Sequence, residues 1–291
     1  MRKKISTAAL AFLFFMMVMG QSIVLAGDST VITLGADLSQ DQKEMILNKF
    51  GVPQDVEHLT VTNEEQLEAL GEYLSPTVIG KRAYSSAKVV PAQKDSGIGV
   101  SVDENINWVT EEMYINALVT AGVEDAEVTI AAPFPVSGTA ALTGIIKAFE
   151  SAKGVKLSEK QVDAANEELV KMSTLGKKIG DPQKASQLVS ELKNQLGQLN
   201  PKTDNDYRSL INKVAKDMGI DLTEDQINSL MDLLKKLKSL DVDWKQLAKQ
   251  AANIHGKFSE IMEENPEVRS LWGQVVDFFK NIFDIVLQLF K

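Results

Sequence analysis

The sequence predicts an α+β fold, in which an N-terminal mixed sheet with packed helices is followed by an all-helical C-terminal region. Strand and helix signals alternate between residues 31 and 153, and no convincing strand signal follows. The charge pattern changes at the same point. Residues 28–153 carry 19 acidic and 8 basic side chains, whereas residues 154–291 carry 21 and 20. We therefore expect an acidic α+β domain over 27–153 and a helical region over 154–265.

The N-terminus has the features of a secretory signal peptide over residues 1–26. Three basic residues, Arg2 to Lys4, precede an uncharged apolar run from Ile5 to Met19. Small residues at Val24 and Ala26 then predict cleavage after Ala26. A retained membrane anchor is the alternative, but the run is shorter than the ~20 apolar residues that a spanning helix needs.

The first half of the mature chain contains signals for several strands and helices in alternation. Strands are expected at 31–34, 58–62, 83–90, 98–102 and 127–131, and helices at 38–50, 63–74, 111–121 and 137–153. The turn-forming stretch Lys94-Asp95-Ser96-Gly97 predicts that strands 83–90 and 98–102 pair as a hairpin. Asn63, Thr110 and Ser137 are the expected caps of the last three helices.

The second half carries apolar residues at helical spacing from start to end. Helices are expected to begin near Glu159, Pro182, Thr203, Thr223, Asp243 and Pro266. A Leu-Ser/Thr-x-x-Gln pattern starts at residues 38, 157 and 222, and it predicts a capping box at each of these helix starts. A duplicated functional unit is the alternative explanation, but the similarity fades after the first turn.

The C-terminal segment 266–291 is expected to form an amphipathic, aromatic-rich helix. Its polar residues form one narrow stripe, and the apolar residues cover most of its circumference. We expect this helix to dock on the protein's own helical region. Insertion into a membrane or a partner is the alternative, and the contacting residues would then be Trp272, Phe279, Phe283 and Phe290.

Composition excludes several kinds of chemistry. The chain contains no cysteine and two histidines, so disulfides, thiolate sites and three-histidine zinc sites are impossible, and we expect no metal and no cofactor. A net charge of −9 argues against a nucleic-acid partner, which requires a basic patch. Forty acidic residues leave open a glycosidase-like pair of carboxylates, because some such pair arises by chance.

The run from Ala132 to Gly144 leads from an expected strand into an expected helix. The first amides of such a helix form an anion-accepting end, to which Ser137 and Thr139 could add hydroxyl donors beside Gly138. The run lacks the lysine and glycine spacing of a phosphate loop. A purely structural role is the alternative, with Ser137 as the N-cap and two glycines, Gly138 and Gly144, allowing the helix to pack closely on the sheet.

Several segments resemble the YpuA-like family of secreted proteins from Gram-positive bacteria. The resemblance is carried by residues 31–38, 84–86, 116–123, 133–144 and 276–279. It covers essentially the whole mature chain. It implies an extracytoplasmic location in a Gram-positive organism, and it implies no catalytic residue because the family is a domain of unknown function.

The sequence therefore favours a secreted or cell-envelope protein that is a non-enzymatic binding or structural component. The expected partner is an unidentified envelope or extracellular molecule. A cell-wall glycan or peptide hydrolase that uses a carboxylate pair is the competing hypothesis. A hydrolase should have a cleft with two facing carboxylates, at least one of which has a raised pKa.

Overall fold

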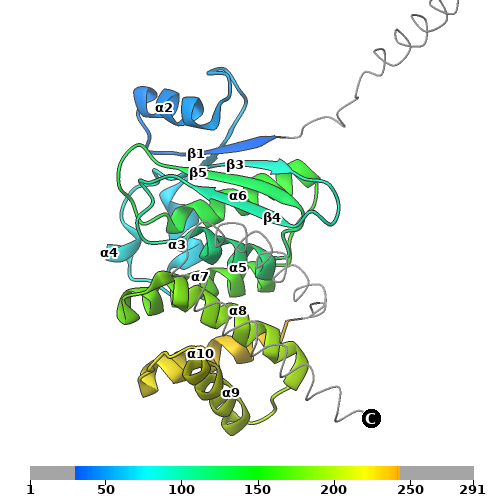
Figure 1. Ribbon diagram of the computed structural model, residues 1–291. Coiled ribbons are helices and arrows are strands. Elements are labelled where there is room, and N and C mark those ends of the chain that lie inside the picture. The colour runs from blue at the N-terminus through cyan, green and yellow to red at the C-terminus, as the bar shows by residue number, and fades with distance from the viewer. Residues whose placement is uncertain (1–29, 241, 243–291) are drawn as a thin grey trace, which may run out of the picture.

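The structure is a computed structural model that describes residues 30–240 and 242 of the chain (Figure 1). Its strands are β1 (Val31–Gly35), β2 (Leu59–Val61), β3 (Ser86–Pro91), β4 (Ile98–Val102) and β5 (Ala126–Ala131). Its helices are α2 (Gln40–Phe50), α3 (Asn63–Leu70), α4 (Pro76–Ile79), α5 (Glu111–Ala121), α6 (Thr139–Lys153), α7 (Glu159–Ile179), α8 (Pro182–Leu199), α9 (Asp204–Asp217) and α10 (Glu224–Lys238). This order confirms the α+β class.

The five strands form one mixed sheet in the order β2-β1-β3-β5-β4. The β1 strand pairs with β2 in parallel and with β3 in antiparallel orientation. The β5 strand is antiparallel to β3 and parallel to β4, so it lies between them. The sheet is therefore completed by a strand that follows β4 in the chain by more than twenty residues.

The expected β3–β4 hairpin is wrong, because the connection between these strands crosses the end of β5. Asp125, the residue before β5, holds this connection in place. Its carboxylate accepts hydrogen bonds from the amides of Asp95 and Gly97 at 3.0 and 2.8 Å, and its carbonyl accepts from Ala92 at 2.7 Å. The turn before β4 is hydrogen bonded to Asp125, and β4 therefore pairs with β5 on the side opposite β3.

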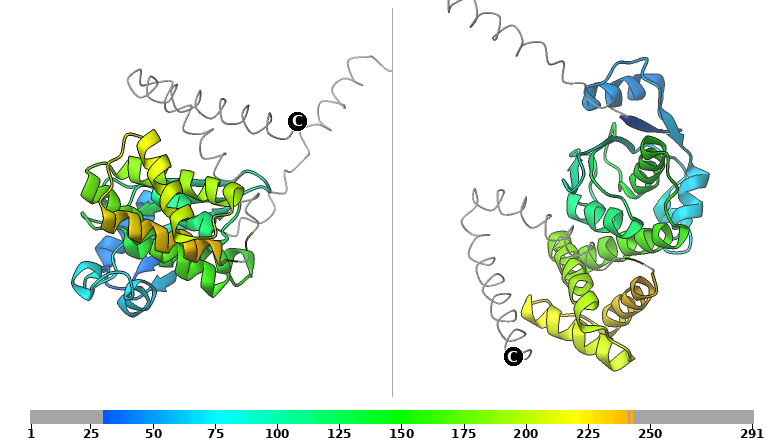
Figure 2. Two further views of the ribbon diagram at one scale, coloured as in Figure 1. Left: turned by 90° about the horizontal axis from the view of Figure 1, so that it is seen from below. Right: turned by 90° about the vertical axis from the view of Figure 1, so that its right-hand side faces the viewer.

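Helices cover both faces of the sheet (Figures 1 and 2). On one face, Ile32 and Leu34 of β1 pack against α2. On the other face, α6 packs on β1 and β3, and α5 packs near β4. The approach of α6 requires Gly144, since a Cβ there would lie 2.7 Å from Thr33 Oγ1. The close-packing role expected for this glycine is confirmed.

The helical region adds further layers below α5 and α6 (Figure 1). The α7 helix packs against α5 and α8, and α9 and α10 pack against each other and against α8. One buried hydrophobic cluster runs from Ala87 of the sheet to Leu240 after α10. The division into two domains at Gly154 stays a prediction, and cooperative unfolding of the isolated 28–153 fragment would test it.

Most helix starts follow the sequence signals. Ser39 with Gln42 and Thr223 with Gln226 form complete capping boxes, as predicted. Ser158 makes no side-chain cap hydrogen bond, so the third predicted box is absent from α7. The cap of α3 is Thr62 and not Asn63, because the Thr62 hydroxyl accepts from the amide of Glu65.

Candidate functional site

A pocket of about 430 Å³ lies at the N-terminal end of α6, where the β5–α6 loop meets the segment after α4. We call it the α6 pocket, and it is lined by residues 78–82, 84–85, 134 and 136–140, together with Gln66 of α3. The three residues proposed from sequence, Ser137, Gly138 and Thr139, all line it.

The helix end in this pocket lacks a side-chain cap. The expectation that Ser137 is the N-cap is wrong, because the helix begins at Thr139 and its cap residue is Gly138, with φ 88°. Instead, the Ser137 and Thr139 hydroxyls lie 3.2 Å apart and hydrogen bond to each other. The Ala141 amide donates to the Gly138 carbonyl at 2.9 Å, but no side chain of the cap residue accepts from the first-turn amides of α6.

The loop that carries this helix end is fixed by buried contacts. The hydroxyl of the fully buried Tyr114 donates to the Gly138 carbonyl at 2.6 Å, and burial raises the pKa of this phenol. The amide of Val109 donates to the Ser137 carbonyl at 3.2 Å. A Cβ at Gly138 would lie 2.4 Å from Ile106 Cγ2 and 2.6 Å from the Tyr114 hydroxyl oxygen, so glycine is required here. The helix end is thus preorganised.

The charged residues that line the α6 pocket are both cations. Lys81 and Arg82 are exposed at its edge, and no carboxylate is among its lining residues. The Arg82 guanidinium donates to the Tyr84 hydroxyl at 2.9 Å. Asp37 lies close enough to Arg82 to interact with it electrostatically. A carboxylate-free, cation-edged pocket is a local exception within the acidic half of the chain.

The buried wall of the pocket contains a polar side chain without a partner. Gln66 has an exposed fraction of 1%, and its Nε2 atom has no hydrogen-bond partner among the described residues. Buried amide groups are almost always hydrogen bonded in folded proteins, so such a group requires an explanation.

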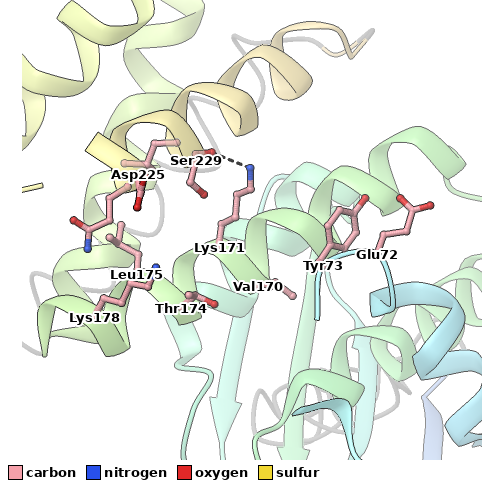
Figure 3. Close-up of a pocket in the computed structure, with 11 residues that line it drawn as sticks. Glu72, Tyr73, Val170, Lys171, Thr174, Leu175, Lys178, Asp225 and Ser229 are labelled. Atoms are coloured by element: carbon pink, nitrogen blue, oxygen red, sulfur yellow. Dashed lines mark hydrogen bonds between the residues drawn. The ribbon is translucent and has the colours of Figure 1, made fainter. Parts of the chain in front are cut away.

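A second pocket, of about 310 Å³, lies between the end of α3, α7 and α10 (Figure 3). We call it the α7–α10 pocket, and it is lined by residues 72–73, 170–171, 174–175, 178, 225–226 and 229–230. Lys171 extends across it to donate to the Ser229 carbonyl at 2.8 Å. The carboxylates of Glu72 and Asp225 lie at opposite ends of the group in Figure 3, so they do not face each other as a catalytic pair would.

An ion network beside this pocket joins the turn after α3 to α7 and α10. The Lys236 ammonium lies 2.7 Å from carboxylate oxygens of Asp163 and Glu167 and donates to the Tyr73 hydroxyl at 2.7 Å, while that hydroxyl donates to Asp163. Desolvation and the bond to Asp163 raise the pKa of Tyr73 to about 12. Desolvation alone would raise the pKa of Asp163, but the bonds from Lys236 and Tyr73 outweigh it and lower this pKa. The charged and hydroxyl groups of this network are hydrogen bonded to one another, which is typical of a structural network.

A second polar network is buried between α5, α7 and α8. The ammonium of Lys193 lies 2.8 Å from Glu168 Oε1 and also donates to Thr120 Oγ1 and to the Asn116 carbonyl, at 2.8 and 2.9 Å. Thr120 in turn donates to the other oxygen of Glu168. Burial raises the pKa of Glu168 despite the neighbouring ammonium.

The carboxyl groups with raised pKa values lie away from the pockets. Among the described residues they are Glu111, Glu168 and Glu191, and burial is the main cause in each case. None of them lines the α6 pocket or the α7–α10 pocket. Neither pocket therefore has the acid–base arrangement expected of a carboxylate hydrolase.

The other sequence-based site expectations concern the C-terminus, metals and membranes. Trp272, Phe279, Phe283 and Phe290 lie outside the described residues. Over the described residues, no group of three or more His, Asp or Glu side chains is placed to hold a metal ion. None of the helices described for this chain combines the length and apolar character needed to span a bilayer.

The structure adds residues to the site that the sequence did not indicate. Gln66, Lys81 and Arg82 come from segments at least fifty residues before the β5–α6 loop. The available signals were the adjacent cations at 81–82 and the Pro-Phe-Pro run before Val136. Neither signal shows that these segments meet.

The fold and the pocket define a helix-rich α+β protein with a preorganised, cation-edged pocket. The family described as "Protein of unknown function (DUF1002)" matches residues 34–254, and the chain belongs to this family. Among known proteins it is similar to the "Uncharacterized protein YpuA" of Bacillus subtilis (strain 168). The two are 41% identical over 263 residues, which cover 90% of this chain and 89% of that protein. No solved structure matches the chain.

Proposed function

We propose that this protein is exported and acts on the extracellular side of a Gram-positive cell envelope as a non-enzymatic binding protein. The observation that carries the proposal is the α6 pocket. Its volume of about 430 Å³ is within the range of small-molecule sites, and the hydrogen bond from the buried Tyr114 hydroxyl to the Gly138 carbonyl holds its helix end. The signal-peptide pattern supports the location, as does the extracytoplasmic place that the resemblance to the YpuA-like family implies.

Binding is favoured over hydrolysis by the chemistry of the pockets. The α6 pocket has no carboxylate in its lining, and the three carboxyl groups with raised pKa values are elsewhere. A carboxylate-pair hydrolase would need both features in one cleft. The described residues therefore offer no specific support for the hydrolase alternative.

Export is tested by the mass of the mature protein. Cleavage after Ala26 should give a secreted chain that begins at Gly27, and intact-mass spectrometry of culture supernatant and washed cells measures this directly. Finding only the uncleaved chain, retained in the cytoplasm, would contradict the proposed location.

Binding is tested with a matched pair of valine variants. Val78 lines the α6 pocket and is 50% exposed, whereas Val155 is 47% exposed and lies outside it. A mixed set of neutral, anionic and cationic aromatic fragments is screened by ligand-observed NMR. We expect at least one fragment to bind the wild type and Val155→Trp but not Val78→Trp, because the indole narrows the pocket. No binding fragment, or equal binding to both variants, would contradict the proposal.

A further inference from the structure

We infer that the α6 pocket recognises a soluble organic phosphate, with the phosphoryl group at the N-terminus of α6 and a ring-containing body against Tyr84 and Phe134. This inference rests on the proposed function, since it assigns a ligand class to the same pocket. Four features of the pocket point to it.

The first feature is the open helix end. The α6 helix has 15 residues, and its cap residue, Gly138, has no side chain that could accept a hydrogen bond from the first-turn amides. Uncapped amides at a helix start point outward and carry partial positive charge, which favours an anion. The Tyr114–Gly138 hydrogen bond of 2.6 Å holds this end in place before any ligand arrives.

The second feature is Gln66, which is independent of the helix. The residue is one of those that line the same pocket, it is almost completely buried, and its Nε2 atom has no partner among the described residues. An unpaired buried donor is unfavourable, and a bound acceptor would satisfy it. A ligand oxygen in the pocket would therefore account for an otherwise unexplained group.

The third feature is the balance of charge and donors. Lys81 and Arg82 line the pocket, and Ser85, Ser137 and Thr139 add hydroxyls, while no carboxylate is present in the lining to repel an anion. A carboxylate offers two oxygens, whereas a phosphate monoester offers three terminal oxygens and a second charge. Amides, hydroxyls, an amide side chain and two cations together match the phosphate better.

The fourth feature is the aromatic wall. The Tyr84 and Phe134 rings pack edge to face, with centroids 4.7 Å apart and an interplanar angle of 70°. Val78 and Val136 add two apolar residues to the lining of the pocket. Inorganic phosphate would leave the wall uncovered, so the expected ligand joins a phosphate to a ring.

The test measures binding of four probes to the full mature chain by isothermal titration calorimetry. The probes are phenyl phosphate, benzoate, inorganic phosphate and benzyl alcohol. We expect phenyl phosphate to bind at least about tenfold more tightly than each of the others, because it alone contacts both the donors and the aromatic wall. Benzoate tests the preference for phosphate over carboxylate.

Two variants and one matched control identify the site. Arg82→Gln and Gln66→Leu should each weaken phenyl phosphate binding about tenfold or more, because each removes a donor to an anionic group. Arg208→Gln is the control, since Arg208 pairs with Glu224 in the helical region, away from the pocket. Circular dichroism and thermal melting confirm that each variant folds, and the comparison of probes on the wild type does not depend on any variant.

The outcomes separate the two proposals. If benzyl alcohol or benzoate binds as tightly as phenyl phosphate and Val78→Trp abolishes that binding, the ligand class is wrong but the binding site remains. If no probe or fragment binds, both proposals fail. If phenyl phosphate binds equally to wild type, Arg82→Gln and Gln66→Leu, the inferred site is overturned.

A membrane-bound source of the same group is tested with vesicles that contain phosphatidic acid. We expect the wild type and Arg82→Gln to sediment equally with these vesicles. If Arg82→Gln alone loses sedimentation, the phosphate belongs to a lipid headgroup, and the assignment to a soluble ligand is overturned.

Discussion

The buried pair of Lys193 and Glu168 allows a sharp test of the packing between α5, α7 and α8. The Glu168 side chain is fully buried and that of Lys193 is 8% exposed, and their charged atoms lie 2.8 Å apart. Replacing Lys193 by Met keeps a similar apolar stem but leaves the Glu168 carboxylate without its cation. An unpaired buried charge is far more costly than the loss of an exposed ion pair.

The expected cost follows from this burial. Removing one member of a buried pair destabilises a protein by about 3–5 kcal/mol. For a chain of about this size, each kcal/mol lowers the melting temperature by roughly 2–4 °C, so Lys193→Met should melt about 6–20 °C lower. The double variant Lys193→Met/Glu168→Leu should recover more than half of the loss, because it removes the stranded charge. Thr120 can then donate to the Asn116 carbonyl, one helical turn away.

The same variant should make stability depend on pH. The pKa of Glu168 is already raised above its ordinary value of 4.5 by burial, and loss of Lys193 raises it further. The folded state then binds the proton more tightly than the unfolded state does. The contribution of Glu168 to stability is therefore fully present below its unfolded-state pKa of about 4.5 and is lost as the pH rises through the folded-state pKa. Lys193→Met should be closer to wild type at pH 5 than at pH 8.

Urea unfolding at both pH values measures these free energies, and Lys156→Met is the matched control. Lys156 also pairs with a glutamate, Glu150, but its side chain is 87% exposed, so the expected loss is at most about 1 kcal/mol. The reasoning would be refuted if Lys193→Met cost no more than this control, or if its effect were the same at pH 5 and pH 8.

Three further predictions follow from other features. Gly138→Ala should destabilise the protein by at least about 2 kcal/mol, and by more than Gly154→Ala does. The added methyl group clashes at Gly138, whereas it meets open space at Gly154. Equal urea midpoints for the two variants would contradict this. The free energy of unfolding of the wild type should fall between pH 5 and pH 3, because the pKa of Asp163 is lowered in the folded state and acid protonates this carboxyl. Lys236→Met should show a smaller fall over the same pH range. Equal falls in the wild type and the variant would show that the network contributes nothing. Deleting residues 266–291 should sharply lower the melting temperature if this segment packs on the protein itself; an unchanged melting temperature with lost liposome binding would identify an anchor.

Local signals in the sequence predicted the elements well, because they act over a few residues. The capping boxes at Ser39 and Thr223 were predicted from the Ser/Thr-x-x-Gln spacing and both formed, whereas the same spacing at Ser158 gave no side-chain cap. The prediction for Ser137 failed because the backbone there is fixed by Tyr114, a distant residue. The Tyr114 hydroxyl bonds the Gly138 carbonyl, and the cap moves to the glycine that tolerates the resulting φ of 88°.

Pairing and site assembly were less predictable, because both depend on contacts between distant segments. The turn at 94–97 looked like a hairpin, but Asp125 holds it over the end of β5. In the candidate site, Ser137 to Thr139 were identified from a strand-to-helix pattern. Gln66 and Arg82 were not identified, because no local sequence pattern indicates that a glutamine will be buried without a hydrogen-bond partner.

The strand order has a consequence for how the chain acquires its structure as it emerges N-terminus first. The β1 and β3 strands can pair as soon as β3 has been made, but β4 has no neighbour until β5 appears. During that interval the apolar face of residues 98–102 stays uncovered, together with the edge of β3 that β5 will occupy. Arrival of residues 126–131 adds two strands to the sheet in one step. Synthesis of β5, and not of the earlier strands, is therefore the event that commits the sheet to its final arrangement, and a chaperone or translocation factor that shields unpaired strands would act before it.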